Sequence, residues 1–277
     1  MLYDKLENNK KIPFHMPGHK RNSKLLGNKL PYSLDVTEID GFDNLHNPES
    51  VIKEIEDKAE KIYNSDKSYL LVNGSTVGIL AAVSSVLNRG DIVLIARNCH
   101  KSVYNAVELA GADARYITCE TDEYGIFSPL NLAEIKCKIE KYSPKLIIIT
   151  SPTYEGVCSD VKAICEIAHI HSIPVLLDAA HGAHIYELGC AADIVIMSLH
   201  KTLPALTQCA LAHINGNLVD YKKFRIKLSV FETSSPSYVL MCSIDECLNC
   251  IDSESFKKMT ADYVLERAKL RDELLKL

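Results

Sequence analysis

Short apolar runs alternate with helical patterns from residue 51 onward, and this alternation constrains the fold more than any other feature. Six runs have the length and continuity of buried strands: Tyr69–Val72, Ile92–Ala96, Ala114–Cys119, Leu146–Thr150, Val175–Asp178 and Ile194–Met197. Helical spacing of apolar residues predicts helices over Val51–Tyr63, Val77–Leu87, Ser102–Ala110, Leu130–Tyr142 and Val161–His171. Buried strands separated by helices predict an α/β fold, with a mostly parallel sheet and helices on both faces.

Two other regions flank this pattern. Residues 1–50 are punctuated by proline and glycine, which predicts an irregular N-terminal segment. Residues 236–277 have mainly helical patterns, ending in a long, charged, amphipathic stretch over Ser255–Leu277. We therefore expect an α/β domain over 51–235, preceded by the N-terminal segment and followed by a helical region. The sequence stops inside the last helical pattern, with no C-cap and no turn.

Composition excludes several classes of protein. With 47% hydrophobic and 24% charged residues among 277, the chain is globular and not disordered. The charge sum of 31 − 36 = −5, without a basic stripe, argues against nucleic-acid binding. No apolar run reaches the roughly 18 residues that span a membrane, and the first residues lack the apolar core of an export signal.

The ten cysteines indicate free thiols in a reducing cytoplasm and not a disulfide scaffold, because a chain of this length builds a core without cross-links. Five of them lie among small apolar residues, as buried thiols do: Cys165, Cys190, Cys209, Cys242 and Cys247. Cys247 and Cys250 form a lone CxxC, which we interpret as one face of a helix; a redox or metal pair is the alternative.

Polar residues follow five of the apolar runs. In an open parallel sheet, ligands bind beyond the carboxyl ends of the strands. The five polar segments are residues 73–76, 97–100, 151–154, 178–181 and 198–201. One such segment would carry little weight, but five together predict a convergent site at one edge of the sheet.

Two charged residues in these segments have a structural and a chemical interpretation. Asp178 ends a buried run, where a carboxylate needs a cation; it either forms a structural ion pair or cap, or holds a protonated ring nitrogen. Lys201 also follows a buried run, where desolvation would favour the neutral amine that a Schiff base requires. The alternative for Lys201 is a side chain that reaches solvent.

Further polar residues have similar alternatives. Gly74-Ser75-Thr76 opens a helix and forms either a phosphate cup or an ordinary N-cap. No GxGxxG or Walker motif is present, which disfavours dinucleotide binding. His100 either stacks on an aromatic cofactor or lies at the surface. His181 and His184 have a spacing that zinc could use, but no third ligand is evident, so we expect no metal.

Taken together, these residues resemble the pyridoxal-phosphate (PLP) enzymes of fold type I, and most closely the ornithine/lysine/arginine decarboxylase family. The resemblance runs from about Ile12 to Glu246 and covers the major-domain portion of that family. The segments that carry it are Pro13–Lys20, Arg97–Ser102, Ser151–Val157, Asp178–His184 and Ser198–Leu203 with its continuation to Gln208.

The resemblance implies a role for each residue. Lys201 would bind PLP covalently as a Schiff base, Asp178 would keep the ring nitrogen protonated, and His100 would stack on the ring. His181 would lie near the ring edge. The implied phosphate contacts are Ser75, Thr76, Ser198 and His200. Residues 232–237 are similar to a family loop that reaches a neighbouring subunit, so Thr233 or Ser234 would contact a partner's phosphate in a homodimer or higher oligomer.

The implied function is PLP-dependent decarboxylation of lysine, ornithine or arginine to the corresponding amine and carbon dioxide, a reaction that forms polyamines and their precursors. Glu155 is the candidate carboxylate for the distal cation of the substrate. Two alternatives stay open. One is another fold type I reaction, by an aminotransferase or a lyase. The other is a truncated, non-catalytic protein. The resemblance motivates it, because family members carry a smaller C-terminal domain after the long helix and this chain ends where that domain would start, so we expect it to be missing.

Overall fold

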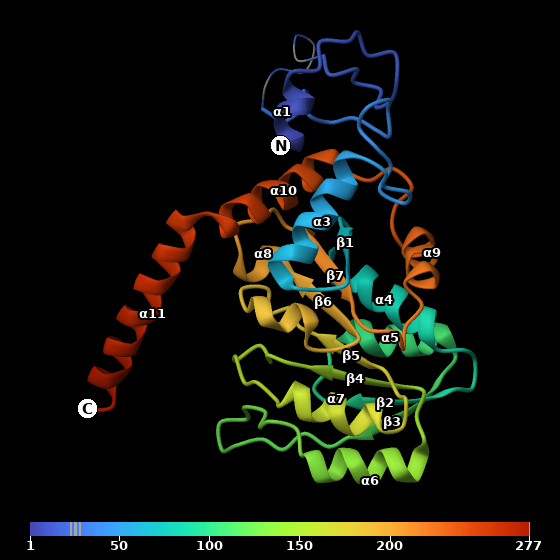
Figure 1. The fold of residues 1–277 in the computed structure, drawn as a ribbon, viewed down its shortest axis with the longest axis vertical. Helices are drawn as coiled ribbons and strands as arrows, with labels where there is room; N and C mark the ends of the chain where they lie inside the picture. Colours follow the sequence, from blue (N-terminus) through green and yellow to red (C-terminus); the bar gives the residue numbers. More distant parts are fainter. Residues whose placement is uncertain (23, 25–26, 28, 277) are drawn as a thin grey trace.

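The computed structural model describes residues 1–22, 24, 27 and 29–276. Within these residues, one mixed sheet forms the centre of the molecule, in the strand order β1-β7-β6-β5-β4-β2-β3 (Figure 1). The strands are β1 Lys67–Leu71, β2 Ile92–Ala96, β3 Asp113–Ile117, β4 Leu146–Thr150, β5 Val175–Asp178, β6 Ile194–Ser198 and β7 Ala210–Ile214. All neighbouring pairs are parallel except those that β7 makes with β1 and β6. The predicted α/β fold with a mostly parallel sheet is confirmed.

Helices cover the sheet, and further helices lie at both ends of the chain (Figure 1). In chain order they are α1 Leu2–Glu7, α3 Val51–Tyr63, α4 Gly74–Val86, α5 Lys101–Ala110, α6 Leu132–Tyr142, α7 Val161–His169, the 3₁₀ helix η1 Tyr186–Cys190, α8 Leu199–Thr202, α9 Tyr221–Phe231, α10 Tyr238–Asp252 and α11 Glu254–Leu274. α4 packs against β1, β6 and β7 and also against α5 and α9, while α3 packs on β1 and α6 lies against β2 and β3.

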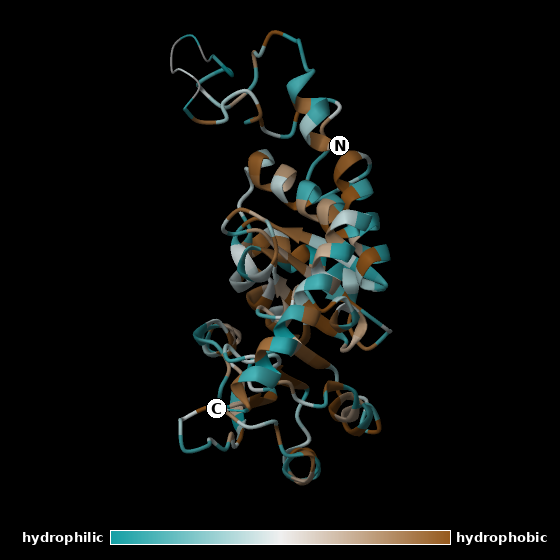
Figure 2. Ribbon diagram, turned by 90° about the vertical axis from the view of Figure 1, so that its left-hand side faces the viewer, coloured by the Kyte–Doolittle hydropathy of each residue, from teal (hydrophilic) through white to brown (hydrophobic). Residues whose placement is uncertain are grey.

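Five of the six predicted apolar runs form the core, because they are buried on both faces. The sixth, Ala114–Cys119, was also expected to be buried, but β3 is an edge strand in which Ile117 alone is buried. In Figure 2 the strands carry most of the hydrophobic colour, and the helices add hydrophilic outer surfaces. β4 and β6 are almost entirely buried along their lengths. Gly78 lets α4 approach the sheet closely, since a Cβ there would lie 2.7 Å from Leu71 Cδ1 and 3.0 Å from Ile196 Cδ1. This packing fixes the position of the α4 N-terminus.

Several predictions about local structure were wrong. β7 was not predicted, because its five residues include His213, whose polarity interrupts the apolar run. The N-terminal segment contains a helix, α1, whose Leu2 and Leu6 are buried. Cys190 was expected to be buried and is exposed. The last residue of the predicted stretch Ser255–Leu277, residue 277, lies outside the described residues.

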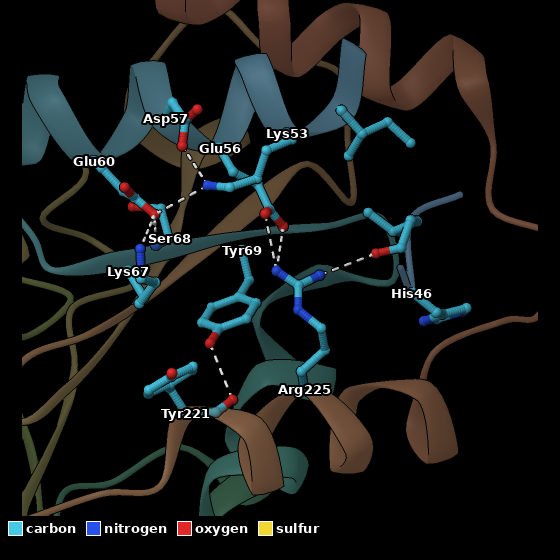
Figure 3. A network of polar contacts seen from close by, with 12 residues as sticks. His46, Lys53, Glu56, Asp57, Glu60, Lys67, Ser68, Tyr69, Tyr221 and Arg225 are labelled. Carbon is cyan, nitrogen blue, oxygen red and sulfur yellow. Dashed lines mark hydrogen bonds and ion pairs between the residues drawn. The ribbon is translucent and has the colours of Figure 1, made fainter. Parts of the chain in front are cut away.

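A polar network joins α3, β1 and α9 on one side of the sheet (Figure 3). Arg225 of α9 donates to both carboxylate oxygens of Glu56 in α3, at 2.9 Å each. The same guanidinium lies 4.5 Å from the ring centroid of Tyr69 in β1. The Tyr69 hydroxyl donates to the carbonyl of Tyr221 at 3.1 Å. These contacts fix α9 beside the start of α4.

Candidate active site

The loops after β1, β2, β4, β5 and β6 meet around a cavity of about 220 Å³ at the carboxyl edge of the sheet. Each of the five predicted polar segments contributes at least one lining residue. The lining consists of Ser75, Asn98, His100, Thr150, Tyr154, Asp178, Ala180, His181 and Lys201. The fold therefore gathers into one small space side chains that lie as far apart in sequence as Ser75 and Lys201.

Asp178 is the buried acid of the cavity. It is the last residue of β5 and only 3% exposed, and its Oδ1 accepts the Ala180 N–H at 3.2 Å. Burial raises the pKa of Asp178, while this N–H and the charges of Lys201 and His100 oppose the rise. A buried carboxylate of this kind is stabilised by a cation bound in the cavity.

Lys201 and His181 lie within hydrogen-bond distance of each other in the cavity lining. Lys201 follows β6 in the short helix α8, and its Nζ lies 3.1 Å from Nε2 of His181. The side chain of Lys201 is exposed, contrary to the buried environment that the sequence suggested. The pKa of His181 is lowered mainly by burial, and the charge of Lys201 adds to this effect. A neutral His181 ring can therefore accept a hydrogen bond from the lysine ammonium.

His100 is held in a defined orientation. It is the N-cap of α5, where its Nδ1 accepts the Ser102 N–H at 3.2 Å and lies 2.9 Å from the Ser102 hydroxyl. Because Nδ1 accepts the backbone proton, the proton of the neutral ring belongs on Nε2. The residue thus caps its helix and lines the cavity at once, while its stacking on a cofactor stays a prediction.

The first turn of α4 opens toward the cavity at Ser75. Gly74 has φ +77°, a left-handed conformation that favours glycine. No acidic side chain lies in the first turn of α4, so none of the helix's own first residues neutralises its positive end. Such a helix end attracts an anion.

Four predicted phosphate contacts lie outside the cavity lining: Thr76, Ser198, His200 and Thr233. The ring Nδ1 of His200 lies 3.0 Å from the carbonyl oxygen of Cys209. Ser198 is fully buried. The backbone N–H of Thr233 donates to Asn73 Oδ1 at 3.1 Å, directly before α4. Their roles as phosphate ligands stay predictions.

Four lining residues were not among the predicted site residues: Asn98, Thr150, Tyr154 and Ala180. Each belongs to a polar segment or strand end that the sequence identified. Tyr154 is 82% exposed, and its ring stands edge-on to His181 with centroids 5.4 Å apart. The buried Oδ1 of Asn98 has no hydrogen-bond partner within the described part of the chain. An unpaired buried acceptor in a cavity lining indicates a donor that arrives with a ligand.

Comparison with known proteins shows the family of the chain. The family model for the Orn/Lys/Arg decarboxylase major domain matches residues 2–277. The chain belongs to the Orn/Lys/Arg decarboxylase family. It is 33% identical over 251 residues to "Arginine decarboxylase" of Bacillus cereus, covering 84% of this chain and 54% of that protein. It is 38% identical over 281 residues to "Uncharacterized protein YaaO" of Bacillus subtilis, covering 95% of this chain and 56% of that protein.

A solved structure of a family member confirms the fold independently. The lysine decarboxylase LdcF of Francisella novicida superposes with a TM-score of 0.85 at 21% identity, over 100% of this chain and 43% of that one. The chain thus spans about half the length of the curated relatives that it matches.

Two kinds of feature are absent from the described residues. No helix among them has the length and apolar character needed to cross a membrane. The same part of the chain holds no group of three or more His, Cys, Asp or Glu side chains placed to bind a metal ion.

Proposed function

We propose that this chain binds PLP and decarboxylates a basic amino acid, lysine, ornithine or arginine, to its amine and carbon dioxide. The observation that carries the proposal is the cavity itself, in which the Lys201 amine and the buried Asp178 carboxylate line one small space. Family membership supports the reaction class, and the arginine decarboxylase relative supports a basic substrate.

The residues present fit the cofactor. Lys201 offers an amine, and Asp178 offers a buried carboxylate that lacks a cation within hydrogen-bond distance among the described residues. Asn98 offers an unpaired acceptor in the same lining. Bound PLP would supply a protonated pyridine ring that accepts the electrons released when a bond at the substrate Cα breaks.

Lys201 and His181 would manage the protons of the reaction. An amine becomes a nucleophile only when neutral, so Lys201 must release a proton first. His181 is placed to exchange this proton, because its Nε2 lies 3.1 Å from Lys201 Nζ and its neutral ring leaves that nitrogen free to accept a hydrogen bond. The same pair can later return a proton to the substrate Cα.

Asp178, His100 and α4 would orient the bound groups. The Asp178 carboxylate would bind the protonated ring nitrogen, which compensates for its burial. The His100 ring, fixed by Ser102, would pack on the face of the cofactor ring. The first turn of α4 would hold the phosphate through its N–H groups and Ser75.

Glu155 is the proposed carboxylate for the distal cation of the substrate. Its position next to Tyr154 of the cavity lining and the action of its charge on His181 support this role. A homodimer or higher oligomer follows from the resemblance of residues 232–237 to a loop that reaches a partner subunit.

Product analysis tests the function. The purified chain is loaded with PLP and given lysine, ornithine and arginine labelled at the carboxyl carbon. We expect labelled carbon dioxide and the matching amine from at least one of them, and neither from Lys201→Ala. A keto acid product would instead support an aminotransferase. Bound PLP without turnover of any of the three would support a non-catalytic protein.

A further inference from the structure

Among the described helices, α4 and α6 are each preceded by an asparagine, and the side chains of these two asparagines make different hydrogen bonds. Asn131 precedes α6, and its side chain caps the helix by accepting the N–H groups of Ala133 and Glu134, at 2.9 and 3.2 Å. Asn73 precedes α4 and makes no side-chain cap bond to that helix. Asparagine is among the best N-cap residues, so the missing cap at α4 has a specific cause.

The cause is visible in the contacts of Asn73. Its Oδ1, the atom that would cap α4, accepts the backbone N–H of Thr233 at 3.1 Å instead. The backbone at Asn73 also departs from the extended conformation of Asn131, with φ −115° and ψ 25° against φ −81° and ψ 114°. The next N–H, that of Gly74, is held by the carbonyl of Gln208 at 2.9 Å.

Thr233 is itself held from two sides. His46, labelled in Figure 3, donates through Nε2 to the Thr233 carbonyl at 2.9 Å. The preceding residue, Glu232, is buried at the end of α9 and accepts the Val72 N–H at 2.7 Å. The segment after α9 is therefore fastened to the β1–α4 turn on both sides of the Asn73 contact.

We propose that the Thr233 N–H is a positioning group that holds the Asn73 side chain away from α4 and so keeps the first amides of α4 free for the phosphate of the cofactor. The proposal rests on the PLP binding proposed above. It gives Thr233 a role within its own chain, carried by the backbone, which is separate from the expected side-chain contact with a partner subunit.

The physical basis is a competition for the same N–H groups. A capping side chain satisfies the amides of the second and third helical residues, and these amides are the ones that an anion at a helix N-terminus would use. A phosphate that must displace a cap loses the free energy of that cap. The expected cost is a weakening of phosphate binding by about five- to tenfold.

Two variants at Asn73 test the proposal without disturbing the core, because Asn73 is exposed. Asn73→Ser introduces a shorter capping residue that can bond α4, whereas Asn73→Ala cannot cap at all. The readout is a ratio of two dissociation constants: that of pyridoxal, which lacks the phosphate, divided by that of PLP. We expect this ratio to fall about five- to tenfold in Asn73→Ser relative to Asn73→Ala. Equal ratios in the two variants would overturn the proposal.

A second pair tests Thr233 directly. Thr233→Pro removes the N–H, and the extended conformation of Glu232, φ −91° and ψ 151°, is one that a following proline accepts. Released from Thr233, Asn73 should cap α4, and the ratio should fall. Adding Asn73→Ala to Thr233→Pro should restore it, because no capping group then remains. A double variant as weak as Thr233→Pro alone would mean that the loop was merely damaged, which contradicts the proposal.

The outcomes separate this inference from the proposed function. If the wild-type chain shows no absorbance of lysine-linked PLP, the proposed function fails. If it binds both PLP and pyridoxal and the variants leave their ratio unchanged, only the role of Thr233 and Asn73 fails.

Discussion

Asp178 and His213 are both fully enclosed titratable side chains, and burial acts on them in opposite directions. Burial disfavours the charged form of either group, so it raises the pKa of Asp178 and lowers the pKa of His213 to about 3. Asp178 lines the candidate active site. His213 lies in β7, where its Nδ1 contacts the hydroxyls of Ser68 and Ser65 at 2.8 and 3.2 Å. Their substitutions should therefore affect different properties.

Asp178→Asn should separate function from stability. Loss of the negative charge that would hold the ring nitrogen should lower turnover by about a hundredfold or more, the usual scale for a preorganised charge at a reacting centre. The free energy of unfolding of the cofactor-free chain at pH 7 should stay level or rise, because the variant no longer buries a carboxylate. Urea unfolding and carbon dioxide release check the two parts. Near-normal turnover, or a large loss of stability, would argue for a structural role.

His213 should make the protein less stable in acid. The native state keeps the ring neutral down to about pH 3, whereas the unfolded chain binds a proton below about pH 6.5. Between these values the unfolded state holds more protons, so the free energy of unfolding falls as the pH drops, by about 1.4 kcal/mol per unit. From pH 7.5 to pH 5, we expect wild type to lose about 2 kcal/mol more than His213→Gln.

The exposed His171 provides the matched control for this measurement, because its ring is solvated in the folded protein. His171→Gln should lose stability in acid to the same extent as wild type. If His213→Gln and wild type showed the same pH dependence of unfolding, proton uptake at His213 would not contribute to acid lability.

At the scale of elements, the Arg225–Glu56 pair fastens α9 to α3. Glu56 is 1% exposed, and burial raises the pKa of Glu56 to about 7 while the Arg225 charge opposes the rise. Removing one partner of such a pair leaves the other charge buried and unpaired. Arg225 lies on α9, which ends just before Glu232 and Thr233, so the pair supports the segment that contacts Asn73.

Arg225→Ala should therefore lower the free energy of unfolding by about 3–5 kcal/mol. Adding Glu56→Gln should recover part of this loss, since the remaining buried group is then neutral. Urea unfolding of the two single variants and the double variant gives the coupling. As a control, Lys269→Ala breaks the exposed pair with Glu266 and should change stability little. Additive losses from Arg225→Ala and Glu56→Gln would contradict a direct interaction.

The sequence predicts those elements whose residues follow a single repeated pattern. α3 was predicted with its exact bounds, Val51–Tyr63, because its apolar residues recur at helical spacing up to the asparagine that ends it. β7 was not predicted, since a buried histidine bonded to serines in another segment looks polar in the sequence alone. The antiparallel direction of β7 is likewise set by its partners β1 and β6, not by its own residues.

The candidate site was predictable to the level of loops. The rule that ligands bind at the carboxyl edge of a parallel sheet identifies the five segments. It does not tell which side chain of a segment points inward, so Asn98 was missed beside His100, and Tyr154 was missed at the end of residues 151–154. The Thr233–Asn73 contact spans 160 residues and involves a backbone N–H, which leaves no trace in a sequence pattern.

At the scale of the whole molecule, we expect association into at least a dimer. Exposed apolar side chains lie along the N-terminal segment, at Ile12, Phe14 and Met16, and along α11, which extends away from the sheet in Figure 1. Large exposed apolar residues grouped on projecting segments are typical of interaction surfaces. Sedimentation velocity of the PLP-loaded chain should give a dimer or larger species. A single monomeric species at micromolar concentration would count against it.

The proposed PLP-dependent function requires above all that the Lys201 amine binds the cofactor. The chain is incubated with PLP, reduced with borohydride to make the link permanent, digested and analysed by mass spectrometry. Two variants are treated in parallel: Lys201→Ala, and Lys101→Ala at another exposed lysine. We predict one modified peptide, containing Lys201, which persists in Lys101→Ala and disappears in Lys201→Ala together with the yellow absorbance. Specific modification of a different lysine, or unchanged absorbance in Lys201→Ala, would contradict the account.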